Sequence, residues 1–162
     1  MKKSIALAIA ILLFSVPVFA QEKKSADEYK TLLGSGTDLE RIEALEFFAQ
    51  EKDKSQIPAI IEVLRETDSP KVAQKAAITL GRIGEKGGST IALKDKIRND
   101  ENPAVNYACI LAIFNIHKKD EDVDPVAKEA LSFANQFRSK DVFIADILKK
   151  LDAKFSITAT ES

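Results

Sequence analysis

One histidine and one cysteine are the residues of this 162-residue chain best suited to nucleophilic or metal chemistry. Because His117 has no second histidine to pair with, a metal site built on two histidines is excluded, and any serine–histidine–carboxylate triad must use this residue. His117 follows an apolar helical segment, so we predict a position at a helix end, facing the helix dipole or solvent. Cys109 lies among apolar residues, which predicts a buried, unreactive thiol, and a lone cysteine excludes an internal disulfide.

Two further segments have compositions that occur in ligand sites. The run Asp120–Asp124 contains four carboxylates, the hard oxygen ligands that calcium prefers. It lacks the glycine and the distal glutamate of a calcium loop, so a solvated loop that ends in a helix cap is the favoured interpretation and calcium the alternative. The glycine-rich stretch Gly81–Thr90 follows a helix and lacks a Gly-Lys-Ser step, which indicates helix termination rather than a phosphate cradle. We therefore expect no catalytic residues, no metal and no cofactor.

The first twenty residues have the pattern of a secretory signal. Two lysines precede an apolar run over 5–14, and small residues lead to Ala20. A membrane anchor is the competing interpretation, but a spanning helix needs about 20 apolar residues, and Pro17 interrupts a run that is already shorter. The sequence thus predicts cleavage between Ala20 and Gln21, a periplasmic or secreted product, and no stable membrane insertion after cleavage.

The charge balance limits the class of partner. The chain has 24 basic and 25 acidic residues, and removal of the two lysines of the leader leaves 22 against 25, a formal charge near −3. Such a balance provides no broad positive field for nucleic acid. The roughly 140 residues that remain match the usual size of one domain and are enough to bury a hydrophobic core.

An internal repeat organises the rest of the chain. Asp68–Val72 opens one segment and Glu101–Val105 opens another about 33 positions later, each with a capping residue followed by proline. Apolar residues follow at helical spacing in both segments. A unit of this length is one helical hairpin, which cannot bury its apolar face alone, so neighbouring hairpins must cover it.

Helix-start signals divide the chain further. Capping boxes, in which a serine or threonine precedes a glutamate by three positions, are predicted at Ser25–Glu28 and Thr37–Glu40. The predicted organisation is a signal peptide at 1–20, a lead-in and capping helix at 21–36, a repeat domain at 37–154 and a flexible tail at 155–162. Within the repeat domain the predicted units are 37–67, 68–100 and 101–137, followed by a C-terminal helix at 139–151.

The three units align on one register. The aligned positions are Leu39, Val72 and Val105, then Ala44, Ala77 and Ile110, then Phe47, Leu80 and Ile113. Over 70–84 the residues follow the order proline, valine, alanine, leucine-glycine and isoleucine-glycine, and this pattern resembles that of the HEAT-repeat family, particularly its short bacterial form. The third unit lacks both glycines of the pattern, and the first unit lacks both glycines and the proline. The resemblance covers about 36–151. It implies an all-α fold, namely an α-α superhelix of stacked antiparallel helix pairs. It also implies that the protein binds a protein partner and catalyses no reaction.

Charged residues recur on the second helix of each predicted pair, which in such a stack lines the concave face. The candidate partner-binding residues are Glu62, Arg65, Glu66, Lys94, Arg98 and Lys128. Because equivalent positions of successive units stack into ladders, these side chains are candidates for binding a charged segment of a partner through charge-assisted hydrogen bonds. The alternative is an exposed face of ion pairs formed within each repeat, which would contribute little to stability.

The sequence favours an exported, non-catalytic scaffold that binds a protein of the cell envelope. One alternative is a structural subunit of an envelope assembly that docks by its terminal helices, where Phe143 and Phe155 provide apolar surface. Another is a small-ligand carrier, since HEAT-like units also occur in lyase-type proteins that handle linear tetrapyrroles. The chain has few side chains suited to binding such a ligand, since it contains one histidine, one cysteine and no tryptophan.

Overall fold

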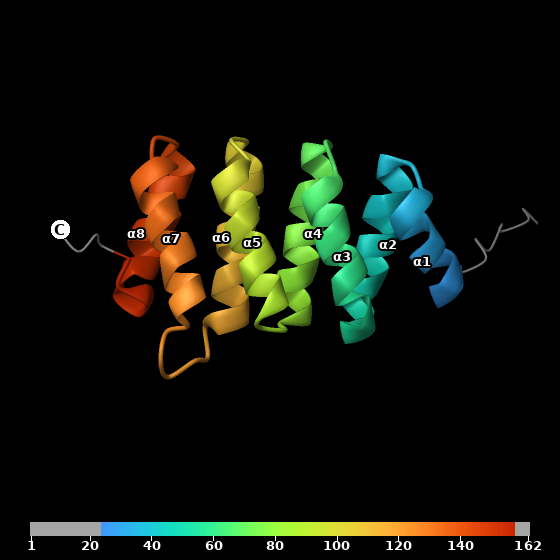
Figure 1. The fold of residues 1–162 in the computed structure, drawn as a ribbon, viewed down its shortest axis with the longest axis horizontal. Helices are drawn as coiled ribbons and strands as arrows, with labels where there is room; N and C mark the ends of the chain where they lie inside the picture. Colours follow the sequence, from blue (N-terminus) through green and yellow to red (C-terminus); the bar gives the residue numbers. More distant parts are fainter. Residues whose placement is uncertain (1–23, 158–162) are drawn as a thin grey trace, which may run out of the picture.

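The computed structural model describes residues 24–157, and helices account for most of them (Figure 1). No strand occurs in this range, so the predicted all-α fold is confirmed. The elements are α1 (Ala26–Ser35), α2 (Asp38–Glu51), the 3-10 turn η1 (Lys54–Gln56), α3 (Ile57–Glu66), α4 (Pro70–Ile83), α5 (Gly88–Asn99), α6 (Pro103–His117), α7 (Pro125–Phe137) and α8 (Val142–Phe155).

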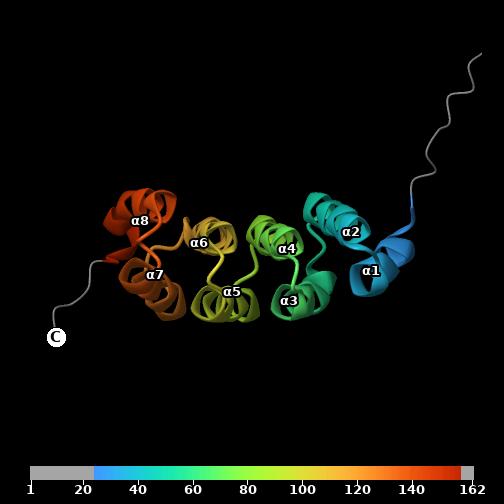
Figure 2. The same cartoon turned by 90° about the horizontal axis from the view of Figure 1, so that it is seen from above.

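Successive helices alternate between two layers that run the length of the molecule (Figure 2). The first-helix layer contains α2, α4, α6 and α8, and the second-helix layer contains α1, α3, α5 and α7. Consecutive helices are antiparallel and pack most closely as the pairs α1–α2, α3–α4, α5–α6 and α7–α8, whereas α2–α3 and α4–α5 have few contacts. These pairs stand side by side in single file (Figures 1 and 2). The structure therefore shows stacked antiparallel helix pairs, with the closest pairing offset by one helix from the predicted units.

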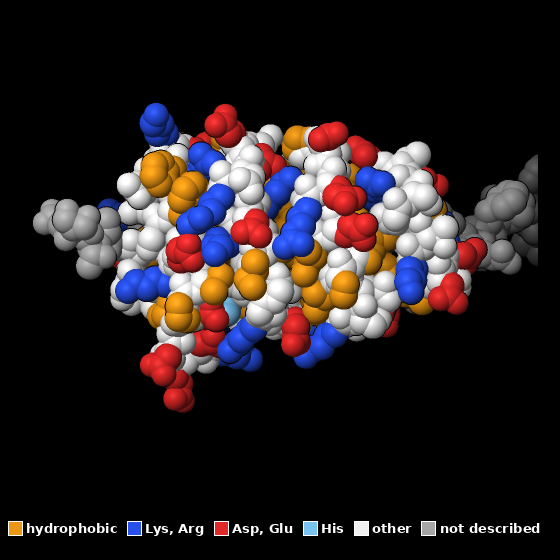
Figure 3. All heavy atoms as spheres, in the orientation of Figure 1, with side chains coloured by type: hydrophobic (Ala, Val, Ile, Leu, Met, Phe, Trp, Pro, Cys, Tyr) orange, Lys and Arg blue, Asp and Glu red, His pale blue; other side chains and the backbone are white. Residues whose placement is uncertain are grey.

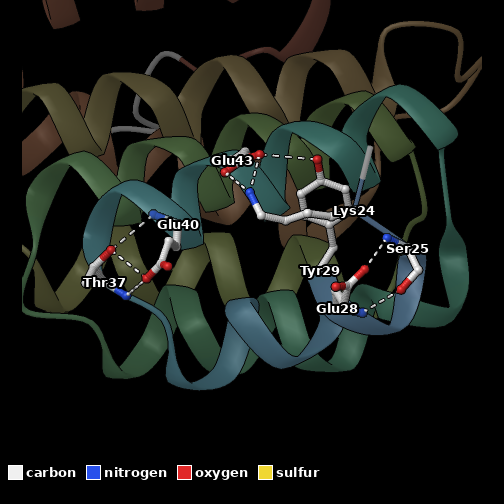
Figure 4. A network of polar contacts seen from close by, with 7 residues as sticks. All are labelled: Lys24, Ser25, Glu28, Tyr29, Thr37, Glu40 and Glu43. Atoms are coloured by element: carbon white, nitrogen blue, oxygen red, sulfur yellow. Dashed lines mark hydrogen bonds and ion pairs between the residues drawn. The ribbon is translucent and has the colours of Figure 1, made fainter. Parts of the chain in front are cut away.

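Local side-chain bonds start the first two helices (Figure 4). The Ser25 hydroxyl accepts a hydrogen bond from the Glu28 amide at 3.2 Å, and the Glu28 carboxylate accepts one from the Ser25 amide at 2.7 Å. Thr37 and Glu40 form the same reciprocal pair at α2. Both predicted capping boxes are confirmed, and the bonds from Ser25 lower the pKa of the Glu28 carboxyl because they stabilise its ionised form.

Proline starts three of the later helices. The first residues of α4, α6 and α7 are prolines, whose missing N–H has no helical partner to lose. Asn102 caps α6 by accepting from the Ala104 amide at 3.0 Å, and Asp124 caps α7 by accepting from the Ala127 amide at 2.9 Å. Ser69 precedes α4 but makes no side-chain capping bond, contrary to the prediction.

The core lies between the layers and between neighbouring units. In the second unit the predicted register holds, because Val72 and Leu80 are both fully buried. In the first unit the register is wrong by one residue: Phe48 is buried in place of Phe47, and Leu39 is 76% exposed. The cause is a shorter repeat, since α2 begins 32 residues before α4 whereas α4 begins 33 residues before α6.

Helices α4 and α6 approach each other closely. A Cβ atom added at Gly81 would lie 2.7 Å from the Cα atom of Ala112, so only glycine fits at this position without a shift of α6. In Figure 2 the file of units bends slightly, with the first-helix layer on the inner side. The second helices therefore lie on the outer side of the bend rather than on the expected concave face, and the close approach of α4 and α6 lies in the inner layer.

The C-terminal segment is helical further than predicted. The last helix begins at Val142 and ends at Phe155, whereas the predicted helix spans 139–151. Phe155 is fully buried, with its ring 6.4 Å from that of Phe114, and Ile157 is also buried. The predicted tail thus starts too early. Residues 158–162 and the predicted signal peptide at 1–20 lie outside the described range.

Candidate functional site

The six predicted partner-binding residues lie in the second-helix layer. Glu62, Arg65 and Glu66 are in α3, Lys94 and Arg98 are in α5, and Lys128 is in α7. Figure 3 shows this face, on which lysine and arginine side chains alternate with aspartate and glutamate. A surface that mixes both signs at this spacing presents no extended field of one sign to a partner.

Most of the predicted cations are paired with the neighbouring unit. The Arg65 guanidinium lies 3.7 Å from the Asp95 carboxylate, which joins α3 to α5. Glu129 of α7 accepts hydrogen bonds from Lys94 at 3.1 Å and from Arg98 at 2.6 Å, which joins α5 to α7. Exposed pairs of this kind contribute about 0.2 to 1 kcal/mol each. The face is therefore ion-paired, as in the alternative interpretation, but these pairs join neighbouring units and not residues of one repeat.

Arg98 also takes part in an aromatic cluster that the sequence analysis missed. The Arg98 and Arg138 guanidinium carbons lie 5.2 Å and 5.6 Å from the centroid of the Phe133 ring. Arg138 also donates to the backbone carbonyls of Ile97 and Arg98, at 3.1 Å and 2.9 Å. These contacts fasten the end of α7 to the end of α5. Phe133 could be assigned to an apolar helix face from its spacing, but no sequence signal indicated the two arginines.

The remaining predicted residues lie elsewhere on the layer. Glu62 and Glu66 line a hollow of about 330 Å³ together with Lys30 and Arg41, so positive and negative side chains face the same space. Lys128 is exposed and forms no ion pair with any residue between 24 and 157. The structure thus distributes the six residues over separate places along the array and does not gather them into one site.

The first-helix layer has a different surface. An apolar hollow of about 520 Å³ lies between α4, α6 and the start of α8, and its wall includes Ile78, Tyr107, Leu111 and Phe143. Ile78 is 40% exposed and Phe143 is 71% exposed. The sequence indicated uncovered apolar surface at Phe143 but not the hollow, because its three helices are far apart along the chain. We refer to this feature as the apolar hollow.

Both layers carry ion pairs between units, Lys75 with Glu46 on the first-helix layer among them, but the layers differ in their exposed apolar surface. On the second-helix layer, cations and carboxylates from successive units meet across the helices. On the first-helix layer, apolar side chains face solvent around a hollow. No family model, curated protein or solved structure matches this chain. A contiguous apolar patch that is exposed to water commonly marks an interaction surface.

His117 belongs to a buried hydrogen-bonded network at the end of α6. Its Nε2 atom lies 2.8 Å from the Thr90 hydroxyl and its Nδ1 atom lies 2.8 Å from the Asp120 carboxylate, which Lys86 also contacts at 2.7 Å. The hydrogen bonds from Lys86 and His117 lower the pKa of the Asp120 carboxyl. The helix-end prediction is correct, but His117 is fully buried rather than solvated.

This network resembles a hydroxyl–imidazole–carboxylate triad only in the order of its groups. Thr90 is 1% exposed, so its hydroxyl has no open path to a substrate, and the network instead fastens the loop after α6 to the start of α5. Cys109 is also fully buried, and burial raises the pKa of its thiol, which agrees with the prediction of an unreactive side chain.

The first and last carboxylates of the acidic run after α6 form hydrogen bonds or ion pairs within the fold. Asp120 binds His117 and Lys86, and Asp124 accepts a hydrogen bond from the amide of Ala127 at the start of α7. Within residues 24–157, no group of three or more potential metal ligands comes together. No helix in the same range is long and apolar enough to cross a membrane.

Proposed function

We propose that this chain is a non-catalytic scaffold that binds an apolar segment of a protein partner in the apolar hollow. The observation that carries the proposal is the exposure of Ile78 and Phe143 on either side of α6, at the rim of a concave apolar surface. Covering such side chains releases about 25 cal/mol for each Å² removed from water. A partner that fills the hollow would therefore be bound with a favourable free energy from the burial of this apolar area.

The elongated shape of the apolar hollow favours a protein segment as its ligand. On α4, Gln74 and Ile78 are one turn apart, and on α6, Ala104, Tyr107 and Leu111 follow one stripe of the helix. The surface is therefore elongated along two parallel helices. A helix that presents apolar residues every three or four positions fits a groove of this kind.

The scarcity of free polar groups in the hollow supports the same choice. Asp141 is its one carboxylate, and it accepts hydrogen bonds from the amides of Phe143 at 3.0 Å and Ile144 at 3.1 Å as the cap of α8. A small-molecule site usually presents several well-placed polar groups that orient its ligand. Apolar side chains of a peptide need no such groups, since burial alone holds them.

We propose that the array is a HEAT-type repeat, supported by its tandem helix pairs and by the prolines that start α4 and α6.

We also propose that the protein is exported, supported by the leader pattern over 1–20. Sequencing the N-terminus of the chain recovered from outside the cytoplasm is expected to give Gln21 as the first residue. Recovery only of uncleaved chain, or only from the cytoplasm, would contradict export.

The partner proposal predicts a position-dependent crosslink. A photo-activatable residue at Leu111 is expected to give a discrete protein adduct in the cells that produce the chain, visible by immunoblot. The double variant Ile78→Gln plus Phe143→Asp is expected to reduce that adduct about tenfold or more, because it removes apolar contacts worth about 1.5 to 3 kcal/mol each when buried. Both side chains are exposed, so the melting temperature should change little.

A matched control lies on the opposite layer. Ile91 is 42% exposed and Phe137 is 51% exposed, so Ile91→Gln plus Phe137→Asp makes the same chemical change away from the hollow. The adduct is expected to persist in this variant. Loss in the control with retention in the hollow variant would place binding on the second helices. Loss on Val142→Asp alone would favour docking by the terminal helix, and no adduct at Leu111 would refute the proposal.

A further inference from the structure

A second hollow of about 520 Å³ lies where α2, α4 and α6 end. Four cations line it: Lys52, Arg82, Lys118 and Lys119. No aspartate or glutamate is among its lining residues. All three helices belong to the first-helix layer, so this basic hollow opens on the same elements that form the apolar hollow.

The basic hollow lies beyond the apolar hollow along α4 and α6, although the two hollows share no lining residue. On α4, Arg82 lies one helical turn beyond Ile78. On α6, Asn115 and Lys118 continue the stripe that contains Leu111. A segment lying along this pair of helices would therefore pass from an apolar surface to a positively charged one within one or two turns.

The cations of the basic hollow are not neutralised within residues 24–157. None of the four forms an ion pair there, whereas Lys75 binds Glu46 and Lys54 binds Glu85. The carboxylate next in sequence after Lys119 is that of Asp120, which Lys86 and His117 already hold. A cleft lined by one sign of charge with no compensating group concentrates its field on whatever enters it.

Helix geometry explains only part of this arrangement. Lys52 and Lys118 are the C-terminal caps of α2 and α6, and Arg82 is in the last turn of α4. Cations at helix C-termini gain about 0.3 to 1 kcal/mol each from the helix dipole, which accounts for their presence. The dipole does not account for the lack of any carboxylate around a hollow that three helix ends share. Because like charges repel, this lack costs stability unless an anion occupies the hollow.

We infer that the protein segment bound in the apolar hollow continues into the basic hollow with aspartate or glutamate side chains. This inference rests on the proposed function, because it identifies the chemistry of the partner at the same groove. Carboxylates of the partner would accept charge-assisted hydrogen bonds from Arg82, Lys118 and Lys119. The apolar part would supply affinity, and the charged part would fix the direction in which the segment lies.

Selection from a library of random 16-residue peptides against the purified chain tests the inference. As a helix, such a peptide spans about 24 Å, close to the roughly 21 Å of α6 between residues 104 and 118. Selected peptides are expected to carry apolar residues at helical spacing with acidic residues towards one end. Their dissociation constants, measured by fluorescence anisotropy, are expected to rise about tenfold in the triple variant Arg82→Gln, Lys118→Gln and Lys119→Gln and to rise with salt.

A charge-matched control uses three exposed lysines that lie outside both hollows. The triple variant Lys30→Gln, Lys128→Gln and Lys149→Gln removes the same net charge and is expected to leave the dissociation constants within about twofold. An equal loss in both triple variants would show a nonspecific charge effect and overturn the inference.

The selection distinguishes failure of the inference from failure of the proposed function. Apolar peptides without acidic residues, whose binding is lost in Ile78→Gln plus Phe143→Asp, would overturn the inference and leave the proposed function standing. Acidic peptides that bind this double variant as tightly as the original chain would contradict the proposed function. A library that yields no peptide above background would overturn both.

Discussion

Replacement of Leu80 by alanine is expected to lower the free energy of unfolding by about 2 to 5 kcal/mol. Leu80 is 0% exposed and lies in α4, which packs against α2, α3 and α6, so the substitution leaves a cavity where two units meet. Urea denaturation followed by circular dichroism measures the loss. A second probe, such as fluorescence of the two tyrosines, checks that the array unfolds as one cooperative unit.

Lys71 provides the control on the same helix. Its side chain is exposed, and it forms no ion pair with a described residue, so Lys71→Ala should change the free energy of unfolding by less than about 0.5 kcal/mol. Lys86 is a poorer choice, although it lies in a turn, because it contacts Asp120 at 2.7 Å. Equal effects of Leu80→Ala and Lys71→Ala would refute the burial of α4 between neighbouring units.

The helix starts could be predicted because their determinants are local. A capping box needs only two side chains three positions apart, and proline fits a first turn whatever surrounds it, so Ser25–Glu28 and Thr37–Glu40 are found in the structure as the sequence suggests. The register of the first unit was wrong because its length differs by one residue from the next. A shift of one position turns Leu39 outward and brings Phe48 inward, since neighbouring helical residues point about 100° apart.

The candidate surfaces were less predictable because they depend on how helices are rotated against each other. Spacing placed Lys94 and Arg98 on one helix face, but their shared partner Glu129 is more than 30 residues away. The apolar hollow combines side chains from α4, α6 and α8, which no local pattern connects. For the basic hollow a signal did exist, since Lys52 and Lys118 occupy the same position after the first helix of their units.

Replacement of Gly81 by valine is expected to destabilise the chain by about 3 kcal/mol or more. Even a single added carbon at Gly81 would meet the Cα atom of Ala112 at 2.7 Å and its Cβ atom at 3.0 Å. The first of these is backbone, which no side-chain rotation can move aside, so α4 and α6 must separate. The free energy of unfolding from urea denaturation measures the cost, and the dissociation constants of selected peptides report the change in the groove that these two helices form.

Gly34 gives the matched comparison. It also lies within a helix, but a Cβ atom there meets nothing within 4 Å, so Gly34→Val should be neutral or slightly stabilising because valine has the higher helix propensity. Opposite signs for the two glycine substitutions would show that contact with α6, rather than loss of backbone freedom, requires glycine at position 81. If Gly81→Val were as stable as Gly34→Val, α4 and α6 would lie farther apart than the structure places them, and both hollows would lose the walls on which partner binding is proposed to depend.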